Sequence, residues 1–381
     1  MNKQHRILVI ARMSPRLNAR TRFLVESLES LCDVTVVSER ADLDNLGHPA
    51  FRRAKLVELI LVFPGKRVWL FTGILRVLHL SARAILETFT NNYDIVVCAD
   101  VIYTLPGLWS KWILRKKFVY DAHEIPWGLG LNPALSWVFK LWEWVVLRSC
   151  DLWLVPSEER ANIVMRAQRV RKPFVVYENF PVGSSSPSDR ERFRLRLYSA
   201  GVPSDKPVVM FQGSISYKRG LEQMIEASKS CQFHMVIQGS GPLLPYLKRV
   251  AHENVTFLDA CPNHECVSWL SAADLCFVYY ENDCLNSAYA CSNKFYAAIF
   301  AGTPIICNRL PAFDLFAQRY GGVVFLDSLS PQDVNNCIYK IVNTPGCYDR
   351  LKREILKARE ELSRLPRKQR LLEAFQALVK T

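Results

Sequence analysis

Short apolar segments alternate with amphipathic helical patterns along almost the whole length of this chain of 381 residues. The first apolar segment, RILVIA at residues 6–11, is followed by a polar loop and by a helical pattern at residues 21–31. A strand buried on both faces has this continuous apolar character, and regular alternation of strands with helices is typical of a parallel sheet covered by helices. The sequence therefore predicts an α/β protein.

The strand-like segments form two series, separated by PVGSSSPSD at Pro181–Asp189, the clearest run of linker-type residues in the chain. We expect a first lobe at residues 1–182 and a second at residues 183–364, each a doubly wound sheet. Ligands of such sheets bind at the carboxyl ends of the strands, so two facing lobes would bind theirs in the cleft between them. The expected strands are RILVIA, DVTVVS, YDIVVCA, KFVYDA, DLWLVPS and PFVVYEN in the first series, and PVVMFQG, FHMVIQG, VTFLD, DLCFVYY, TPIICN and GVVFLD in the second.

The charge balance indicates an anionic partner. Lys and Arg number 49 against 36 Asp and Glu, a formal net charge of +13, and a nucleic acid, an anionic membrane surface or a phosphorylated substrate would each suit it.

The 12 cysteines are scattered and several lie in apolar segments, as in a reduced cytosolic protein. We find no signal peptide and no run of about eighteen apolar residues, so we expect neither secretion nor a membrane span.

One stretch of the second series, PVVMFQGSISYKRG at Pro207–Gly220, has the pattern of a phosphate site. A buried strand ends in a turn at Gly213. The cations Lys218 and Arg219 follow, and Gly220 opens an amphipathic helix. Backbone N–H groups and the dipole at a helix N-terminus attract an anion, and the two cations would neutralise its remaining charge. A solvated basic turn would have the same composition.

A second glycine turn, VIQGSGP at residues 236–242, also follows a strand. Its glycines, Gly239 and Gly241, would let a ligand approach the backbone. The loop after the first strand contains no glycine, and prolines follow the second glycine turn. Neither half therefore carries the G-x-G-x-x-G fingerprint of a dinucleotide domain.

Four motifs in this order, YDAHE, FQGSISYKRGLE, VIQGSGP and SNKFYAAIFAGTPII, resemble those of the large retaining glycosyltransferase family often called family 4, which has the GT-B fold. The resemblance extends over nearly the whole chain and looks closest to bacterial members that build surface polysaccharide or glycolipid. It implies two Rossmann-like lobes facing across a cleft, the first binding the acceptor and the second a nucleotide sugar. It also implies that a C-terminal helix at residues 365–381 packs back on the first lobe, and that transfer needs no metal or other cofactor.

The resemblance places His123 of YDAHE opposite the transferred sugar. Asp121 and Glu124 could fix the tautomer of this histidine or raise its basicity, and we also expect both to contact the acceptor. Alternatively, His123 is a histidine that is satisfied by its flanking carboxylates and takes no part in transfer.

On the donor side, Arg219 occupies the Lys/Arg position that the family has before the helix glycine, and its planar guanidinium suits phosphate oxygens. The family often has a second arginine directly after the strand glycine; here that residue is Ser214, and Lys294 of SNKF could replace the missing cation. Lys218 and Lys294 could equally be exposed lysines. The resemblance implies the donor-binding set Gly213, Ser214, Lys218, Gly239, Gly241, Glu281, Asn282 and Asn293, with His123, Arg219 and Lys294 as the catalytic group.

One departure from the family pattern concerns carboxylates. Many members carry two glutamates near the last motif, one holding the sugar and one the ribose, and here Tyr289 and Ala297 occupy those positions. A residue of the loop Glu281–Asp283 could reach the sugar instead. The donor that we expect is UDP- or GDP-linked. A second interpretation is a catalytically inactive GT-B-like binding subunit of another glycosyltransferase.

Basic residues of the first lobe suit an anionic acceptor, which we expect to be a glycan or a polyprenol-linked sugar. The loop RMSPRLNAR carries Arg12, Arg16 and Arg20, and Arg16 matches a position that is usually basic in related bacterial sequences. Eight of the nine tryptophans lie between Trp69 and Trp153, several near lysines and arginines. Such residues suit an anionic membrane surface, although ordinary packing of helices would also use them.

The motif CPNHEC at residues 261–266 invites a zinc interpretation, with His252 as a further ligand. Its spacing matches no common zinc pattern, so we expect no metal site. The sequence contains no nucleic-acid-binding module. We therefore expect a cytoplasmic enzyme that associates peripherally with the inner face of the cell membrane.

Overall fold

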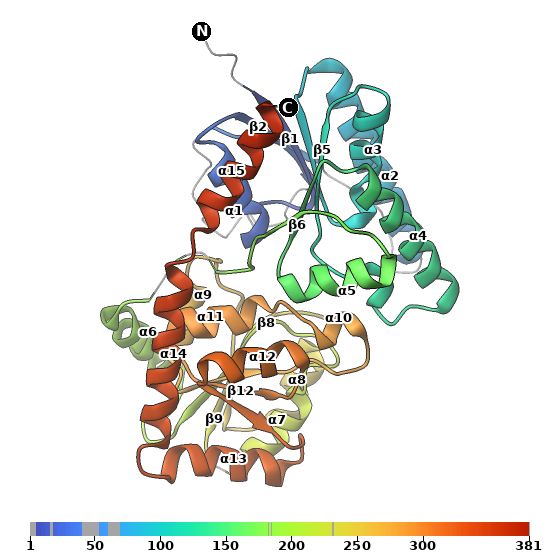
Figure 1. The fold of residues 1–381 in the computed structure, drawn as a ribbon. Coiled ribbons are helices and arrows are strands. Elements are labelled where there is room, and N and C mark those ends of the chain that lie inside the picture. Colours follow the sequence, from blue (N-terminus) through green and yellow to red (C-terminus); the bar gives the residue numbers. More distant parts are fainter. Residues whose placement is uncertain are drawn as a thin grey trace. The chain divides into compact units, whose positions relative to one another are not determined.

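The computed structural model describes residues 5–15, 18–39, 53–59, 69–181, 183, 185–230 and 232–380. The chain forms two compact units. Unit 1 comprises Met1–Asn179 and Pro366–Thr381, and unit 2 comprises Phe180–Leu365. Each unit consists of a parallel sheet flanked by helices (Figure 1), which confirms the α/β class with two Rossmann-like lobes.

The sheet of unit 1 has the strand order β3-β2-β1-β4-β5-β6-β7. The chain begins in the middle of the sheet, winds outward to β3, and returns to the other side of β1 for the remaining strands. The winding thus reverses between β1 and β4, where doubly wound sheets bind their ligands. The strands are β1 (Arg6–Met13), β2 (Asp33–Glu39), β3 (Lys55–Leu59), β4 (Ile95–Ala99), β5 (Lys117–Asp121), β6 (Leu152–Val155) and β7 (Phe174–Val176).

Side-chain caps start several helices of unit 1. Asn18, Asn132 and Ser157 each accept a hydrogen bond from the backbone N–H three residues ahead, which satisfies a donor that the first turn leaves unpaired. The helices are α1 (Ala19–Leu28), α2 (Trp69–Thr90), α3 (Leu105–Trp112), α4 (Pro133–Ser149), α5 (Glu158–Gln168) and α15 (Arg367–Lys380), with 3₁₀ turns η1 (Val101–Tyr103) and η2 (Pro126–Gly128).

The C-terminal helix α15 belongs to unit 1, although the whole of unit 2 precedes it in the sequence. It packs against α1 and β7 (Figure 1). Leu371 and Phe375 of this helix are buried in the core of unit 1, and Arg370 donates a hydrogen bond of 2.8 Å to the carboxylate of Glu178. Apolar burial and an ion pair therefore both hold the C-terminal helix on unit 1.

The sheet of unit 2 has the strand order β10-β9-β8-β11-β12-β13. Counted from its own first strand this order is 3-2-1-4-5-6, the order of dinucleotide-binding sheets, and the winding reverses between β8 and β11. The strands are β8 (Val208–Ser214), β9 (His234–Ser240), β10 (Val255–Leu258), β11 (Leu275–Val278), β12 (Ile305–Asn308) and β13 (Val323–Leu326). The helices are α6 (Pro187–Ser199), α7 (Leu221–Ser228), α8 (Leu244–Val250), α9 (Cys266–Ser271), α10 (Leu285–Ala288), α11 (Asn293–Ala301), α12 (Pro311–Tyr320), α13 (Pro331–Asn343) and α14 (Cys347–Ser363).

Two details differ from the sequence prediction. The apolar pattern does not predict β3, because this edge strand, KLVEL, is only half-buried and mixes charged with apolar residues. Within the expected linker Pro181–Asp189, Ser186 and Asp189 form a capping box and α6 begins at Pro187. Serine, proline and aspartate suit the start of a helix as well as a linker, so composition alone does not distinguish the two.

Candidate functional site

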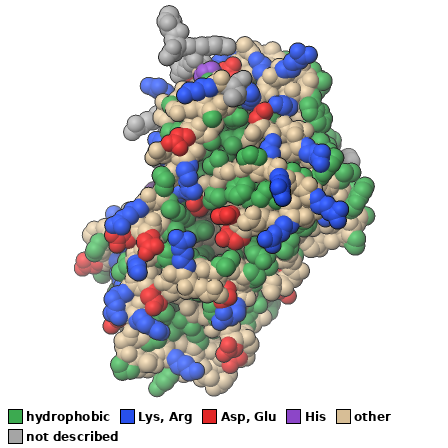
Figure 2. Space-filling model, in the orientation of Figure 1, with side chains coloured by type: hydrophobic (Ala, Val, Ile, Leu, Met, Phe, Trp, Pro, Cys, Tyr) green, Lys and Arg blue, Asp and Glu red, His purple; other side chains and the backbone are tan. Residues whose placement is uncertain are grey.

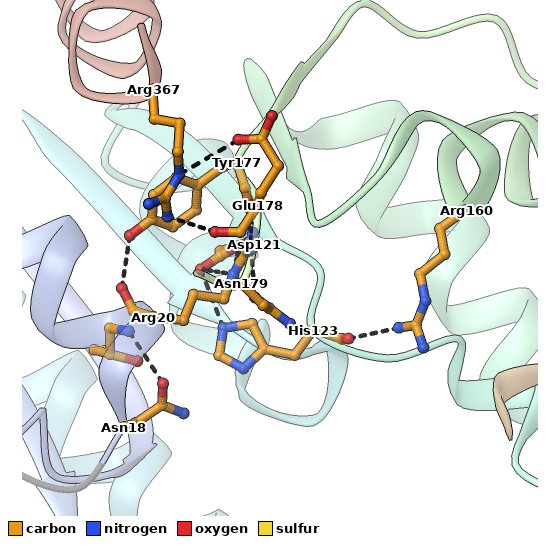
Figure 3. A network of polar contacts seen from close by, with 10 residues as sticks. Asn18, Arg20, Asp121, His123, Arg160, Tyr177, Glu178, Asn179 and Arg367 are labelled. Carbon is orange, nitrogen blue, oxygen red and sulfur yellow. Dashed lines mark hydrogen bonds and ion pairs between the residues drawn. The ribbon is translucent and has the colours of Figure 1, made fainter. Parts of the chain in front are cut away.

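In unit 1, polar side chains gather where β5 and β7 end (Figure 3). Nε2 of His123 lies 3.1 Å from Oδ2 of Asp121. Arg20 of α1 contacts the same carboxylate, with its Nη2 atom 2.5 Å and its Nε atom 3.0 Å from Oδ1. The Asp121 carboxylate therefore lies between the arginine and the histidine.

Asp121 supports the histidine from behind. Burial disfavours a charge on this fully buried carboxylate, yet Arg20 and His123 together hold its pKa well below the ordinary value. A hydrogen bond from His123 to a carboxylate fixes the tautomer and orientation of the imidazole. The predicted contact between Asp121 and an acceptor is wrong. The Asp121 side chain has no exposed surface and has two protein partners, so it is not available to a ligand.

The pairing of Arg20 with Asp121 was not predicted from the sequence. Its Nη1 atom donates to the backbone oxygen of Tyr177 and, at 2.9 Å, to Oδ1 of Asn179, and the Tyr177 hydroxyl donates to the backbone oxygen of Arg20 at 2.7 Å. Arginine has several donors in a rigid plane, so one side chain can bridge β5 and the segment after β7. Only the recurrence of arginines in the loop after β1 hinted at it. Arg12 is exposed, and Arg16 lies outside the described residues.

Glu124 takes a different position from Asp121. Its side chain is 46% exposed, and its Oε2 atom lies 3.5 Å from Nη1 of the buried Arg160. The same Nη1 atom donates a 2.7 Å hydrogen bond to the backbone oxygen of His123. Arg160 of α5 therefore holds the segment of His123 and Glu124 in place, and about half of the Glu124 side chain stays accessible to a ligand.

Asp100, directly after β4, is a further residue of this region that sequence analysis missed. Its φ of +76° is unusual for a residue other than glycine and costs conformational energy. Burial raises the pKa of its carboxyl group, whereas the nearby His123 and Arg12 lower it. The signal in the sequence was weak: a single aspartate at the end of the strand YDIVVCA.

In unit 2, two cations lie at the glycine turn that ends β8. The Lys294 side chain covers Gly213, since a Cβ atom added to this glycine would come within 3.0 Å of Cε of Lys294. The Lys294 ammonium lies 4.2 Å from the ring centroid of Phe211, and the Arg219 guanidinium 4.1 Å from that of Tyr280. Residues from β8, the loop after it, the end of β11 and the start of α11 thus meet at one place.

These two cations have no anionic partner within the part of the chain that the structure describes. The Nζ atom of Lys294 and the Nε atom of Arg219 are buried without a hydrogen-bond partner among the described residues. Burial, followed by repulsion from Arg219, lowers the pKa of Lys294 to about 7. Uncompensated buried charge is costly, so this arrangement is suited to an anion such as a diphosphate.

Lys218 does not share this arrangement. It adopts a φ of +64°, and its ammonium pairs with Asp283 and, at 3.6 Å, with Glu281. These ion pairs join the loop after β8 to the loop after β11. The other expected donor residues, Asn282 and Asn293, are exposed, and Ser214 is the last residue of β8, paired with Ser240 of β9.

Packing of the protein itself requires the remaining glycines. A Cβ atom on Gly239 would lie 1.9 Å from the backbone oxygen of Gly213, and one on Gly241 would lie 2.2 Å from that of Ile215. Both residues also have positive φ, +143° and +158°. The close approach that demands glycine is therefore between β8 and β9, and a ligand is not needed to explain it.

The carboxylates that the family pattern places near the donor are absent. Ala297 is buried in the core of unit 2 with Phe295 and Ala298, and Tyr289 follows the short helix α10.

No group of three metal-ligating side chains occurs among the described residues. His252 contacts the backbone oxygen of Ile225 at 2.9 Å, so it serves the packing of α7. No described helix is both long and apolar enough to cross a lipid bilayer.

Comparison with known proteins agrees with this architecture. Residues 18–180 match the family model described as Glycosyltransferase Family 4. Most of unit 1 is thus similar to a glycosyltransferase domain, and the two parallel sheets with their flanking helices form a GT-B fold.

Three of the proteins that this chain is similar to illustrate the extent of the similarity. An uncharacterized glycosyltransferase of Methanocaldococcus jannaschii is 27% identical over 178 residues, which span 43% of this chain and 44% of that relative. Sucrose-phosphate synthase from Thermosynechococcus elongatus has a TM-score of 0.72 at 16% identity, over 99% of each chain. HepE of Anabaena, solved in complex with UDP and glucose, has a TM-score of 0.71 at 14% identity, over 99% of this chain and all of that one.

Proposed function

We propose that this protein is a glycosyltransferase that moves a sugar from a nucleotide-sugar donor to an acceptor. One observation carries the proposal: the half-buried cations Arg219 and Lys294, beside the glycine turn that ends β8, each have a buried nitrogen atom without a hydrogen-bond partner among the described residues. The leaving nucleoside diphosphate gains negative charge as the sugar departs, and preformed cations stabilise that charge without reorganisation. The donor is UDP- or GDP-linked; the structural relative HepE binds UDP and glucose.

His123 faces the transferred sugar in this proposal. Its side chain is 19% exposed and its Nε2 atom contacts Asp121, so part of the imidazole is accessible to a ligand while the carboxylate orients the ring. Arg219 and Lys294 hold the diphosphate, and no metal takes part. The motifs that resemble a retaining family support transfer with retention of anomeric configuration.

The acceptor is a lipid-linked sugar or a growing glycan, used in the synthesis of a surface polysaccharide or glycolipid. Exposed apolar side chains on unit 1 support this choice. In Figure 2, hydrophobic surface lies beside Lys and Arg side chains along the edge of unit 1 where Figure 1 places α2, α3 and α4. The exposed apolar residues there are Ile74, Leu78, Leu86, Phe89, Trp112, Ile113, Trp137, Val138 and Leu141. Arg148 of α4 and Arg115, in the connection between α3 and β5, are exposed as well.

An anionic membrane surface binds such a combination, because aromatic and basic side chains both find favourable depth at the lipid headgroups. We therefore place the protein in the cytoplasm, peripherally attached to the inner face of the cell membrane. Vesicles with anionic lipid should co-sediment with the protein and neutral vesicles should not. Replacing Trp137 and Val138 by serine should weaken this binding, whereas replacing the exposed Tyr339 of unit 2 by serine should not.

Donor binding is tested by the thermal stability of the purified protein with UDP, GDP, ADP, CMP and their sugar conjugates. A ligand that binds only the folded state raises the midpoint by mass action. The proposal predicts a rise with UDP or GDP that is lost in Arg219→Ala and retained in Lys248→Ala, a matched control at an exposed lysine of α8. Equal nucleotide affinity in Arg219→Ala and in the unmodified protein would contradict the proposed donor site. Analysis of the product anomer by NMR tests retention.

A second candidate is a catalytically inactive binding subunit of another glycosyltransferase. The absence of both family carboxylates, at Tyr289 and Ala297, favours it. This candidate predicts no stabilisation by any nucleotide and no sugar turnover by the isolated protein, together with a transferase that co-purifies with it. A nucleotide-dependent shift of the midpoint would reject it.

A further inference from the structure

Two cysteines lie side by side between β10 and α9: Cys261 in the connecting loop and Cys266 as the first residue of α9. The Sγ atoms of Cys261 and Cys266 are 3.6 Å apart, and four residues separate the two cysteines. Both are half-buried, whereas Cys98, Cys276 and Cys307 are buried in strands. The buried cysteines thus serve as small apolar side chains, whereas the thiols of Cys261 and Cys266 contact each other.

Hydrogen bonds connect this pair to the carboxyl end of β8. The side-chain amide nitrogen of Gln212 lies 3.6 Å from Sγ of Cys261, and it donates to the backbone oxygen of Cys266 at 3.2 Å and to Oε1 of Gln238 at 2.9 Å. Gln212 directly precedes Gly213. The cysteine loop is therefore held against the same edge of the sheet as the proposed donor site.

The two thiols are chemically different. A hydrogen bond from Cys261 lowers the pKa of the Cys266 thiol, against the opposing effect of burial, while the same contact raises the pKa of Cys261. Burial raises the pKa of Cys98 and of Cys276. Since the thiolate is the reactive form of cysteine, Cys266 is the better nucleophile of these four cysteines. Cys261 lies close enough to resolve a mixed disulfide formed at Cys266.

A metal site does not explain the pair. No group of three His, Cys, Asp or Glu side chains with metal-binding geometry exists in the described part of the chain. Two thiolates alone fall short of the four ligands of a structural zinc site.

We propose that Cys261 and Cys266 form a reversible disulfide by exchange with a small-molecule disulfide such as oxidised glutathione. The Cys266 thiolate attacks one sulfur of glutathione disulfide, the glutathione S–S bond breaks, and one glutathione leaves as a thiolate. Cys261 then loses its proton and attacks Cys266 Sγ, which releases the second glutathione. Two protein thiols are oxidised, one glutathione disulfide is reduced to two glutathione thiols, and the two thiol protons end on them.

The geometry permits this step with a small movement. A disulfide has an S–S bond of about 2.05 Å, so the sulfurs must approach by roughly 1.5 Å from their present separation of 3.6 Å. Cys261 is in a loop and Cys266 is at the first position of a helix rather than in the interior of a strand, and both residues are partly accessible. A reducing compartment keeps disulfide bonds of this kind transient, which suits a reversible modification.

Peptide mapping tests the proposal on the intact chain of 381 residues. After incubation with oxidised glutathione, free thiols are blocked with N-ethylmaleimide and the protein is cleaved after glutamate. Cleavage after Glu253, Glu265 and Glu281 yields the peptides 254–265 and 266–281. The proposal predicts that these peptides stay covalently joined, with a mass lower by two hydrogen atoms than their sum, and that dithiothreitol separates them.

Variants identify the partners. Peptide 266–281 also contains Cys276, so the link must persist in Cys276→Ala and disappear in both Cys261→Ser and Cys266→Ser. The variant Cys284→Ala, at a half-buried cysteine directly before α10, is the matched control and must keep the link. Cys261 and Cys266 both found blocked, or Cys266 found only as a stable adduct with glutathione, would overturn the proposal. Because nucleotide plays no part, this result is independent of whether the proposed donor site is right.

Discussion

Replacement of Lys294 by methionine tests the proposed donor site most directly. The ammonium of Lys294 is buried without a hydrogen-bond partner among the described residues. Burial and the neighbouring Arg219 lower its pKa from 10.5 to about 7. Each tenfold change in proton affinity is worth about 1.4 kcal/mol, so the charged ammonium costs the folded state roughly 4–5 kcal/mol. Methionine has a similar length, no charge and enough flexibility to fill the same space.

The effect on stability follows from proton linkage. Between pH 7 and 10.5 the unfolded chain holds the Lys294 proton more firmly than the folded chain, so the contribution of Lys294 to the free energy of unfolding rises with pH across this window. The cost is complete below pH 7 and vanishes above 10.5. Allowing for local relaxation, we expect Lys294→Met to stabilise the ligand-free protein by about 2–4 kcal/mol at pH 6.5. The advantage should shrink as the pH increases toward 10.

Nucleotide binding should change in the opposite direction. A hydrogen bond to a charged group is worth about 1.5–3 kcal/mol, so losing the ammonium should weaken UDP or GDP about 10- to 100-fold. Thermal unfolding from pH 6 to 10 and calorimetric titration of nucleotide measure the two effects, with Lys248→Ala as the control. The reasoning is refuted if Lys294→Met is less stable than the unmodified protein at pH 6.5, if the difference is independent of pH, or if nucleotide affinity is unchanged.

Three further predictions concern the two units separately. Arg20→Ala leaves the buried Asp121 carboxylate without its main cationic partner and should cost about 3–5 kcal/mol; denaturant unfolding measures this, and a loss below 1 kcal/mol would contradict it. His123→Ala should lower kcat about 100-fold or more while nucleotide affinity stays constant, and equal turnover by the variant in a sugar-transfer assay would show that the histidine is merely structural. Gly239→Ala places a Cβ atom 1.9 Å from the Gly213 backbone oxygen, so we expect a loss of at least about 2–3 kcal/mol; a variant with an unchanged melting temperature would refute that packing argument.

Local sequence patterns predicted most of the fold. Strand–helix alternation predicted the strands of both sheets apart from the half-buried edge strand β3. Apolar periodicity reports which side chains are buried, and burial in a parallel sheet follows from the same pattern. The edge strand escaped because few of its residues have to be apolar.

The sequence by itself determined the two Rossmann-like sheets and the short list of cations and glycines near their carboxyl ends. Only the tertiary structure decided the partners. Asp121 and Glu124 are three residues apart, yet one is buried beside Arg20 and the other is exposed. Lys294 lies over Gly213, whereas Lys218 pairs with Asp283. The physical reason is that burial and ion pairing depend on which distant segments pack together, and a side chain's charge alone does not tell whether an internal partner or a ligand will satisfy it.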